Sequence, residues 1–292
     1  SSGGAHPARP KARPSARPSS TLAVMTDITS RAPQDAALVS AVREAVEARF
    51  PTTLQTLTDL VAIPGIAWDS ADRTQLERSA EAVAGLLREA GLQEVEIVSE
   101  TSDDDRPGGP AVIGEKPGAS DKPTVLLYAH HDVQPIGDED LWDTPPLEAT
   151  ERGGRVYGRG AADCKGNVAM HLAALRAVDN NGGTKVNLKY LIEGSEERGG
   201  EGLSQLIKDR PELFAADAIL IADAGNSAVG QPTLTTSLRG GAQIGVQVDT
   251  LAAGVHSGQF GGAAPDAAKA LMRAIDSLSD EYGRTVIDGV DT

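Results

Sequence analysis

Cysteine is nearly absent from the sequence, which has only Cys164. A disulfide framework within the chain is therefore excluded, and a reducing compartment suits this composition without being established by it. Long hydrophobic stretches are also missing, since no run reaches the roughly 18 apolar residues of a membrane-spanning helix. The opening segment SSGGAHPARPKARPSARPSS has no apolar stretch typical of a secretion signal. We expect no membrane span, no secretion and a cytoplasmic location.

Basic residues are the minority among the charged ones. The chain has 27 Lys and Arg against 42 Asp and Glu, which gives a formal net charge of -15 at pH 7. Such acidity disfavours nucleic acid or an anionic membrane surface as a partner. It leaves carboxylates available to bind cations.

The chain is long enough for about two domains. Residues 1–30 are basic and rich in Pro and Ser, so we expect a disordered tail there, and Met25 is either the true start or an internal residue. Residues 31–236 form the larger predicted domain. The pattern changes near Ser237, and residues 237–292 form a smaller α+β unit that we expect to be incomplete.

Helical and strand patterns alternate along the larger domain, which predicts an α/β fold with a largely parallel mixed sheet and helices on both faces. Helices are expected over 35–50, where Pro51 interrupts the pattern, and over 57–64, 73–91, 167–178 and 201–210. Strands are expected over 94–99, 111–116, 124–129, 155–160, 186–194 and 218–223. In the smaller unit, 242–250 alternates like a strand and 264–278 is predicted to be a helix.

Potential metal ligands follow three of the predicted strands. His130 follows VLLYA, Glu196 and Glu197 follow LKYLIEG, and Asp223 ends AILIAD. Because ligands collect at the carboxyl ends of strands in open α/β sheets, we expect these groups to converge. Asp163, in the turn GRGAADCKG before a helix, is a fourth candidate.

Several carboxylates and one imidazole in a poorly solvated cleft would repel one another without a cation. We therefore predict a pair of divalent metal ions. Histidine with carboxylates suits zinc best, and cobalt or manganese is also compatible with these ligand types.

Each candidate also has an ordinary structural interpretation. Taken alone, His130 would be interpreted as a buried histidine whose hydrogen bonds are satisfied or as a surface residue. The spacing to Asp132, however, is typical of an imidazole ligand that is oriented by a carboxylate. His131 is expected to point the other way and to be structural. Cys164 is interpreted as a small buried residue and His171 as a core residue.

The acidic candidates have similar alternatives. Asp163 alone could cap the helix that follows it. Glu196 and Glu197 could form a solvated helix start, and Asp223 could be a loop residue that closes a strand.

Taken in order, the segments YAHHDVQP, VYGRGAADCKGN, LIEGSEERGGEGL, ILIADAGN and GVHSGQFGGAAPDAAKAL resemble the two-zinc amidohydrolases of the aminoacylase, carnosine dipeptidase and acetylornithine deacetylase group. The cytosolic dipeptidase branch is the most similar part of that group. The resemblance extends from about Leu38 to Leu278. It implies hydrolysis of a peptide or amide bond in a dipeptide or an N-acyl amino acid.

The resemblance also implies roles for the metal ligands. His130 and Asp223 match ligands of one metal, Asp163 the carboxylate that bridges both, and Glu197 a ligand of the other. Asp132 matches the residue that orients His130. In the family, the peptide bond that follows the bridging carboxylate is often strained. In this sequence that bond joins Asp163 to Cys164.

The remaining implied roles concern catalysis. Glu196 matches the general base, which takes a proton from the water between the metals and later passes it to the leaving nitrogen. His256 matches a lid-domain histidine that reaches the partner subunit's active site and helps to hold the oxyanion. A homodimer formed through the lid domain, residues 237–292, is implied in the same way.

The sequence departs from the family pattern at its end. It stops inside the expected lid, and no histidine after His256 completes the second metal site. Two interpretations follow: the amino-terminal part of a dipeptidase-like hydrolase, or a short metal-binding or dimerising homologue without catalysis. The presence of Glu196 favours the first.

Overall fold

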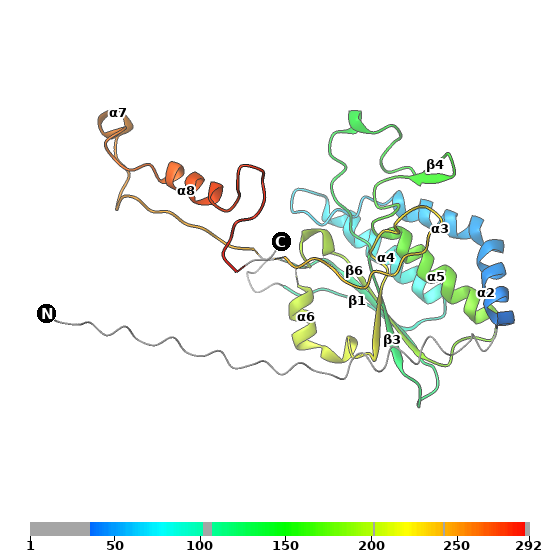
Figure 1. The fold of residues 1–292 in the computed structure, drawn as a ribbon. Helices are drawn as coiled ribbons and strands as arrows, with labels where there is room; N and C mark the ends of the chain where they lie inside the picture. The colour runs from blue at the N-terminus through cyan, green and yellow to red at the C-terminus, as the bar shows by residue number, and fades with distance from the viewer. Residues whose placement is uncertain (1–35, 102–106, 201, 242, 290–292) are drawn as a thin grey trace. The chain divides into compact units, whose positions relative to one another are not determined.

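A computed structural model describes residues 36–101, 107–200, 202–241 and 243–289 (Figure 1). The chain divides into two compact units, Ser1–Gly225 and Asn226–Thr292. The expected tail at residues 1–30 lies outside the described residues. The predicted domain boundary near Ser237 stays a prediction.

The first unit contains a five-stranded mixed sheet with the order β1-β2-β6-β3-β7. β6, β3 and β7 run parallel, whereas β2 is antiparallel to both β1 and β6. The strands are β1 (Gln93–Val98), β2 (Ala111–Lys116), β3 (Thr124–His130), β6 (Asn187–Glu193) and β7 (Ala218–Ile221). The predicted α/β fold with a mixed sheet is confirmed, and its parallel half carries the candidate ligands.

Helices cover both faces of this sheet. One face packs against α3 (Phe50–Val61), α4 (Arg73–Glu89) and α5 (Lys165–Asn180), and α2 (Ala36–Ala48) contacts α5. Their shared core includes Leu60, Val83, Leu87, Leu172 and Ile192. The other face packs against α6 (Leu203–Asp209) and the short helix η3 (Pro211–Leu213). Burial of apolar side chains on both faces holds the sheet edge that bears the site.

Proline and glycine mark the helix ends as expected, with one difference. Pro51 does not simply interrupt a helix, because it lies in the first turn of α3, where a missing backbone N–H costs nothing. At the other end of the helical region, Gly91 has φ of 82° and follows α4. The expected helix start at Asp35 and the first residue of the 201–210 helix lie outside the described residues.

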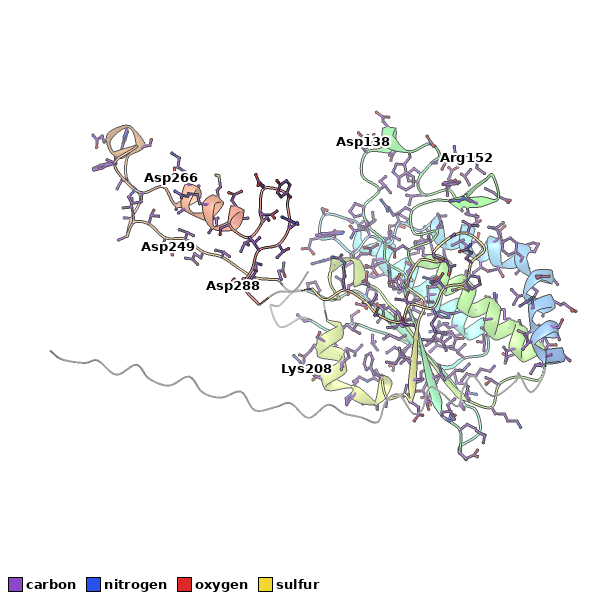
Figure 2. The ribbon with its side chains drawn as sticks, in the orientation of Figure 1. Asp138, Arg152, Lys208, Asp249, Asp266 and Asp288 are labelled. Carbon is purple, nitrogen blue, oxygen red and sulfur yellow. The ribbon has the colours of Figure 1, made fainter. Side chains whose placement is uncertain are left out.

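Among its described residues, the first unit also contains a hairpin and three short helical turns. The hairpin pairs β4 (Thr150–Arg152) with β5 (Arg155–Tyr157), of which the sequence predicted only the second strand. Arg152, labelled in Figure 2, lies on β4. Its Nη2 forms an ion pair with Asp143 Oδ2 at 3.0 Å. The remaining turns of helix are η1 (Glu139–Leu141) and η2 (Glu196–Arg198).

The second unit confirms one of its two predicted elements. The predicted helix is present as α8 (Ala267–Asp276), where Asp266 Oδ1 accepts from Lys269 N at 3.1 Å; a short helix, α7 (Ser257–Phe260), precedes it. The predicted strand over 242–250 is wrong for the described residues 243–250, which form no strand. A strand needs a partner for its backbone hydrogen bonds, and no described residue pairs with this segment.

Among the described residues, no helix combines the length and the apolar character needed to cross a membrane.

Candidate metal centre

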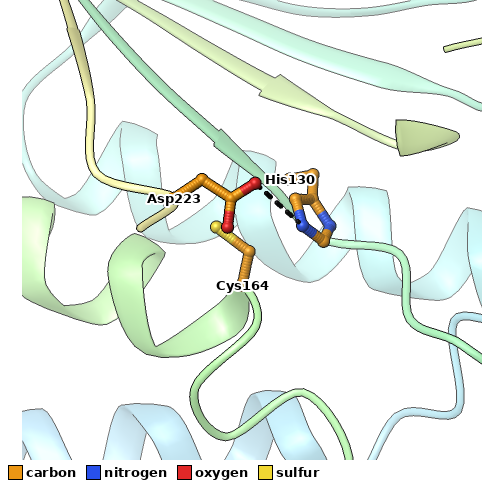
Figure 3. Close-up of side chains that lie close together, drawn as sticks. All are labelled: His130, Cys164 and Asp223. Carbon is orange, nitrogen blue, oxygen red and sulfur yellow. Dashed lines mark ion pairs between the residues drawn. The ribbon is translucent and has the colours of Figure 1, made fainter. Parts of the chain in front are cut away.

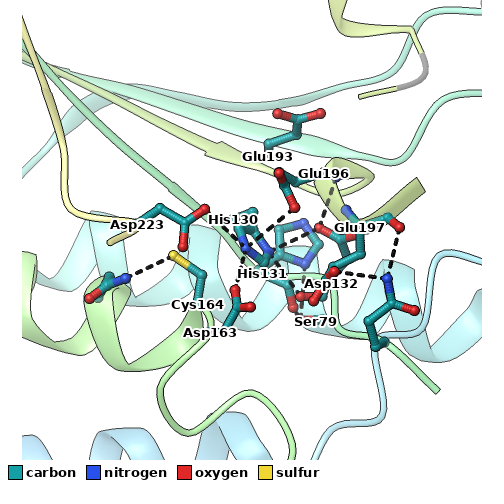
Figure 4. Close-up of polar contacts among 12 residues, drawn as sticks. Ser79, His130, His131, Asp132, Asp163, Cys164, Glu193, Glu196, Glu197 and Asp223 are labelled. Carbon is teal, nitrogen blue, oxygen red and sulfur yellow. Dashed lines mark hydrogen bonds and ion pairs between the residues drawn. The ribbon is translucent and has the colours of Figure 1, made fainter. Parts of the chain in front are cut away.

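His130 is the last residue of β3, and its side chain is fully buried. Its Nε2 faces three carboxylates (Figure 4): Asp163 Oδ1 at 2.9 Å, Asp223 Oδ2 at 3.6 Å and Glu196 Oε2 at 3.8 Å. The carboxylates come from the turn before α5, the loop after β7 and η2, all at the carboxyl ends of the strands. The structure therefore brings together side chains that lie up to 93 residues apart in the sequence, between His130 and Asp223.

The ionisation of His130 reflects these neighbours. Burial lowers the pKa of its imidazole, but the hydrogen bond and charge of Asp132, with the charges of Asp223 and Glu196, outweigh this effect and raise the pKa to about 9. In the metal-free protein the imidazole thus carries the positive charge that the surrounding carboxylates require.

The other three predicted metal ligands lie close to this imidazole. Ligand atoms of His130, Asp163 and Glu197 all lie within 4.8 Å of one another. A second group with the same spacing contains His130, Cys164 and Asp223 (Figure 3). The two groups overlap at His130, and their combined donors are an imidazole nitrogen, three carboxylates and a thiol.

Cys164 is the one member of these groups that was not predicted to bind metal. Burial raises the pKa of its thiol to about 12, and Asn167 Nδ2 donates to its Sγ at 3.1 Å. Because the thiolate is the form that binds metal, these surroundings support a structural cysteine. The peptide bond between Asp163 and Cys164 is cis.

The helix-cap interpretation of Asp163 does not hold in this structure. The residue before α5 is Cys164, and its side chain forms no capping hydrogen bond. The Asp163 carboxylate instead accepts a hydrogen bond from His130 Nε2, and 67% of its side chain is exposed. Asp163 therefore has room for a further partner beside His130.

Asp132 connects the end of β3 to the two glutamates. Its Oδ1 accepts from Glu196 N at 3.2 Å, and its Oδ2 accepts from Glu197 N at 3.1 Å. His130 Nδ1 donates to the backbone carbonyl of Asp132 at 3.1 Å and lies 3.4 Å from its Oδ1. The sequence suggested an effect on His130 alone, whereas the fully buried Asp132 carboxylate also fixes the η2 backbone.

Glu196 and Glu197 lie in the first turn of η2, so the helix-start interpretation is correct as far as secondary structure goes. The side chain of Glu196 is 42% exposed, and burial is the main cause that raises the pKa of its carboxyl. Glu196 therefore combines contact with His130 and access to solvent.

The other histidines differ from His130. His131 is buried between Pro110 O, 2.7 Å from its Nε2, and Ser79 Oγ, 3.1 Å from its Nδ1, which agrees with a structural role. Burial lowers the pKa of His131 to about 4. His171 is buried with Nε2 3.2 Å from Tyr128 O.

His256 belongs to the second unit. It is exposed, and its Nδ1 accepts from Gly258 N at 3.1 Å at the start of α7. Its role in catalysis stays a prediction.

Sequence reasoning missed a buried carboxyl beside the site. Glu193 ends β6, is 3% exposed, and accepts a hydrogen bond from Tyr128 Oη on Oε2 at 2.7 Å. Among the described residues its Oε1 has no hydrogen-bond partner. Burial raises the pKa of Glu193 to about 7. The only signal in the sequence was a glutamate at the end of an apolar strand, next to two more conspicuous glutamates.

A buried lysine beside Asp163 was also missed. Lys165 is 1% exposed, and its Nζ donates to Leu60 O at 2.8 Å and to Ile63 O at 2.6 Å. It thereby ties the start of α5 to the end of α3. Nothing in the local pattern distinguishes this lysine from a surface residue.

The donor set fits a divalent metal ion. One imidazole and several carboxylates are the ligands typical of zinc and related ions, and here their ligand atoms lie within 4.8 Å of one another in two overlapping groups. The fold and these side chains define an α/β protein with a candidate metal centre at the carboxyl ends of its parallel strands.

The model of peptidase family M20/M25/M40 matches residues 126–291. This segment is more than half of the chain and includes every predicted site residue. The chain belongs to peptidase family M20/M25/M40.

Individual relatives agree with this family. The chain is 57% identical over 217 residues to a cysteinylglycine-S-conjugate dipeptidase of Corynebacterium striatum, a match that covers 74% of this chain and 46% of the relative. Among solved structures, the dipeptidase Dug1p of Saccharomyces cerevisiae has a TM-score of 0.68 at 27% identity, covering 87% of this chain and 55% of that one.

Human carnosine dipeptidase 1 has a TM-score of 0.65 at 30% identity, with the same coverage of 87% and 55%. The chain thus spans about half the length of the relatives that it matches.

Proposed function

We propose that the protein hydrolyses the peptide or amide bond of a dipeptide or an N-acyl amino acid in a metal-dependent reaction. The observation that carries this proposal is the group formed by His130, Asp163 and Glu197, whose ligand atoms lie within 4.8 Å of one another beside Glu196. The relatives are named dipeptidases, which supports a dipeptide as substrate.

The metal site would hold two divalent ions, for which zinc suits the donors best. His130 and Asp223 would bind one ion, Glu197 the other, and Asp163 both. Bound divalent ions would lower the pKa of water and supply positive charge for a developing oxyanion. Asp132 would keep the ligands in place, because it holds the backbone N–H groups of Glu196 and Glu197.

Glu196 would act as the general base. Its carboxylate is partly exposed, lies 3.8 Å from His130 Nε2, and has a pKa raised mainly by burial. A raised pKa improves a carboxylate as a proton acceptor near neutral pH. Glu196 would take a proton from the attacking water and deliver it to the leaving nitrogen, so its charge is restored at the end of the cycle.

The same proposal includes a cytoplasmic location and a homodimer formed through residues 237–292. It also includes a role for His256 in holding the oxyanion. The name of the Corynebacterium striatum relative suggests cysteinylglycine and its S-conjugates as the first substrates to test.

The proposal is tested by treating the full-length protein with a chelator and restoring zinc, manganese or cobalt separately. Cysteinylglycine, a cysteine S-conjugate of it, β-alanyl-histidine and an N-acetyl amino acid would be the substrates. We expect hydrolysis to disappear with the chelator and to return with at least one metal. Absence of hydrolysis with every metal and substrate, or full activity in chelator, would contradict the proposal.

A further inference from the structure

Gln134 holds the side chain of Glu197 from outside the cluster of acidic ligands. Its Nε2 donates to Glu197 Oε2 at 2.9 Å and to the Glu197 backbone carbonyl at 3.0 Å. On the other side, Trp68 Nε1 donates to Gln134 Oε1 at 3.3 Å. One amide side chain therefore joins the loop after α3 to η2.

The three partners allow only one orientation of the Gln134 amide. An indole N–H can only donate, whereas a backbone carbonyl and a carboxylate can only accept. If the amide turned over, its NH₂ group would face the indole N–H and its oxygen would face two acceptors. Trp68 thus keeps both amide hydrogens directed at Glu197.

The hydrogen bond from Gln134 makes the two carboxylate oxygens of Glu197 unequal. Oε2 is occupied by Gln134, while Oε1 has no hydrogen bond within the described residues. The backbone of Glu197 is also fixed at both ends, since its N–H donates to Asp132 Oδ2 at 3.1 Å and its carbonyl accepts from Gln134. Little freedom is left for the side chain to turn.

We propose that Gln134 is a positioning residue that orients the Glu197 carboxylate so that it binds its divalent ion mainly through Oε1, with Trp68 fixing the Gln134 amide. This inference rests on the proposed metal-dependent function. A carboxylate whose second oxygen already accepts a hydrogen bond keeps its first oxygen fully available to the ion, and loss of such an outer partner weakens metal binding by about 10- to 100-fold.

The test compares zinc affinities of the full-length parent protein with those of Gln134→Met, Trp68→Phe and Gln55→Met, by competition with a chelating indicator. Gln55 is the matched control, because its Nε2 donates to the Asp59 carboxylate at 2.8 Å on the exposed surface of α3. We expect Gln134→Met to weaken one of the two metals by about 10- to 100-fold. Trp68→Phe should weaken the same metal to a smaller extent, and Gln55→Met should weaken neither.

Two further measurements separate positioning from a general structural role. The metal-free forms of Gln134→Met and the parent should unfold at the same temperature. In addition, the visible absorption spectrum of the cobalt-loaded variant should change, because Glu197 would gain a second oxygen for the ion.

Unchanged affinity of both metals in Gln134→Met would overturn the inference, and so would an equal loss at both sites with a lower unfolding temperature of the metal-free form. If the parent binds two metals and hydrolyses dipeptides, such results contradict only the role of Gln134. A parent that binds no divalent ion contradicts the proposed function and this inference together.

Discussion

His130 is the residue on which the negative charges of the site converge. Its ring lies 2.9 Å from Asp163 and 3.6 Å from Asp223, and its pKa is raised to about 9 in the absence of metal. A metal ion would compete with a proton for the same imidazole nitrogen. We therefore expect proton release when metal binds near neutral pH, which links metal affinity to pH.

Removal of the Glu196 carboxylate should separate catalysis from metal binding. We expect Glu196→Ala to reduce dipeptide hydrolysis by about 100-fold or more, because it removes the group that transfers the proton, while metal content stays near normal. Kinetics and elemental analysis of the full-length protein would measure both. Glu89→Ala, on the exposed surface of α4, is the matched control. A Glu196→Ala variant that keeps most of the parent's rate of hydrolysis would exclude Glu196 as the base.

The buried Glu193 carboxyl should make the metal-free protein less stable at higher pH. Its pKa rises from 4.5 to about 7 on folding, mainly by burial, so the folded state binds the proton more tightly than the unfolded chain. The free energy of unfolding then falls as pH rises through this range, by about 3 kcal/mol at most.

The side chain of Glu193→Gln cannot ionise and still offers Tyr128 an oxygen to donate to. The free energy of unfolding of this variant should therefore not show the fall with rising pH that is expected of the parent. Denaturant unfolding of metal-free parent and variant between pH 4.5 and 8 would measure it. Glu89→Gln is the control. Parallel profiles for Glu193→Gln and the parent would show that Glu193 carries no raised pKa.

The helix α4 anchors one face of the sheet through a row of buried side chains. Leu87 is fully buried in the core that also contains Val112 and Tyr190. We expect Leu87→Ala to lower the free energy of unfolding by about 2 to 5 kcal/mol, because it leaves a cavity. Leu141→Ala, at a position 83% exposed, should change it by less than about 0.5 kcal/mol. Similar effects of both variants on denaturant midpoints would contradict this packing.

Periodic segments were predictable from the sequence because their patterns are local. The spacing of Leu76, Ala80, Val83 and Leu87 reflects one buried helix face, and all four are buried in α4. The strand predicted over 242–250 by the same kind of argument is wrong for the described residues 243–250. Alternation of apolar and polar residues indicates a buried face but does not supply a strand to pair with. β4 was missed because its three residues, Thr-Glu-Arg, include no apolar side chain.

The candidate site was predictable only in part, for a similar reason. The proximity of His130, Glu197 and Asp223 followed from strand ends that meet at one sheet edge. The contacts of Gln134 and Lys165 depend on loops that return to the site, and no local pattern encodes such a return.

In the molecule as a whole, the candidate metal ligands all belong to the unit Ser1–Gly225, whereas His256 belongs to Asn226–Thr292. The described strands, helices and η2 turn that position the ligands lie within the first unit. Metal binding is therefore expected to depend on side chains of the first unit and to tolerate changes in the second. If His256 helps to hold the oxyanion, His256→Ala should hydrolyse the substrate more slowly without losing metal.

The most direct measurement is the metal content per chain, by elemental analysis, of the full-length parent, His130→Ala and His256→Ala. We expect the parent and His256→Ala to retain divalent metal, and His130→Ala to lose it, because every carboxylate of the cluster is arranged around that imidazole. Equal metal content in His130→Ala and the parent would contradict a metal centre at this edge of the sheet.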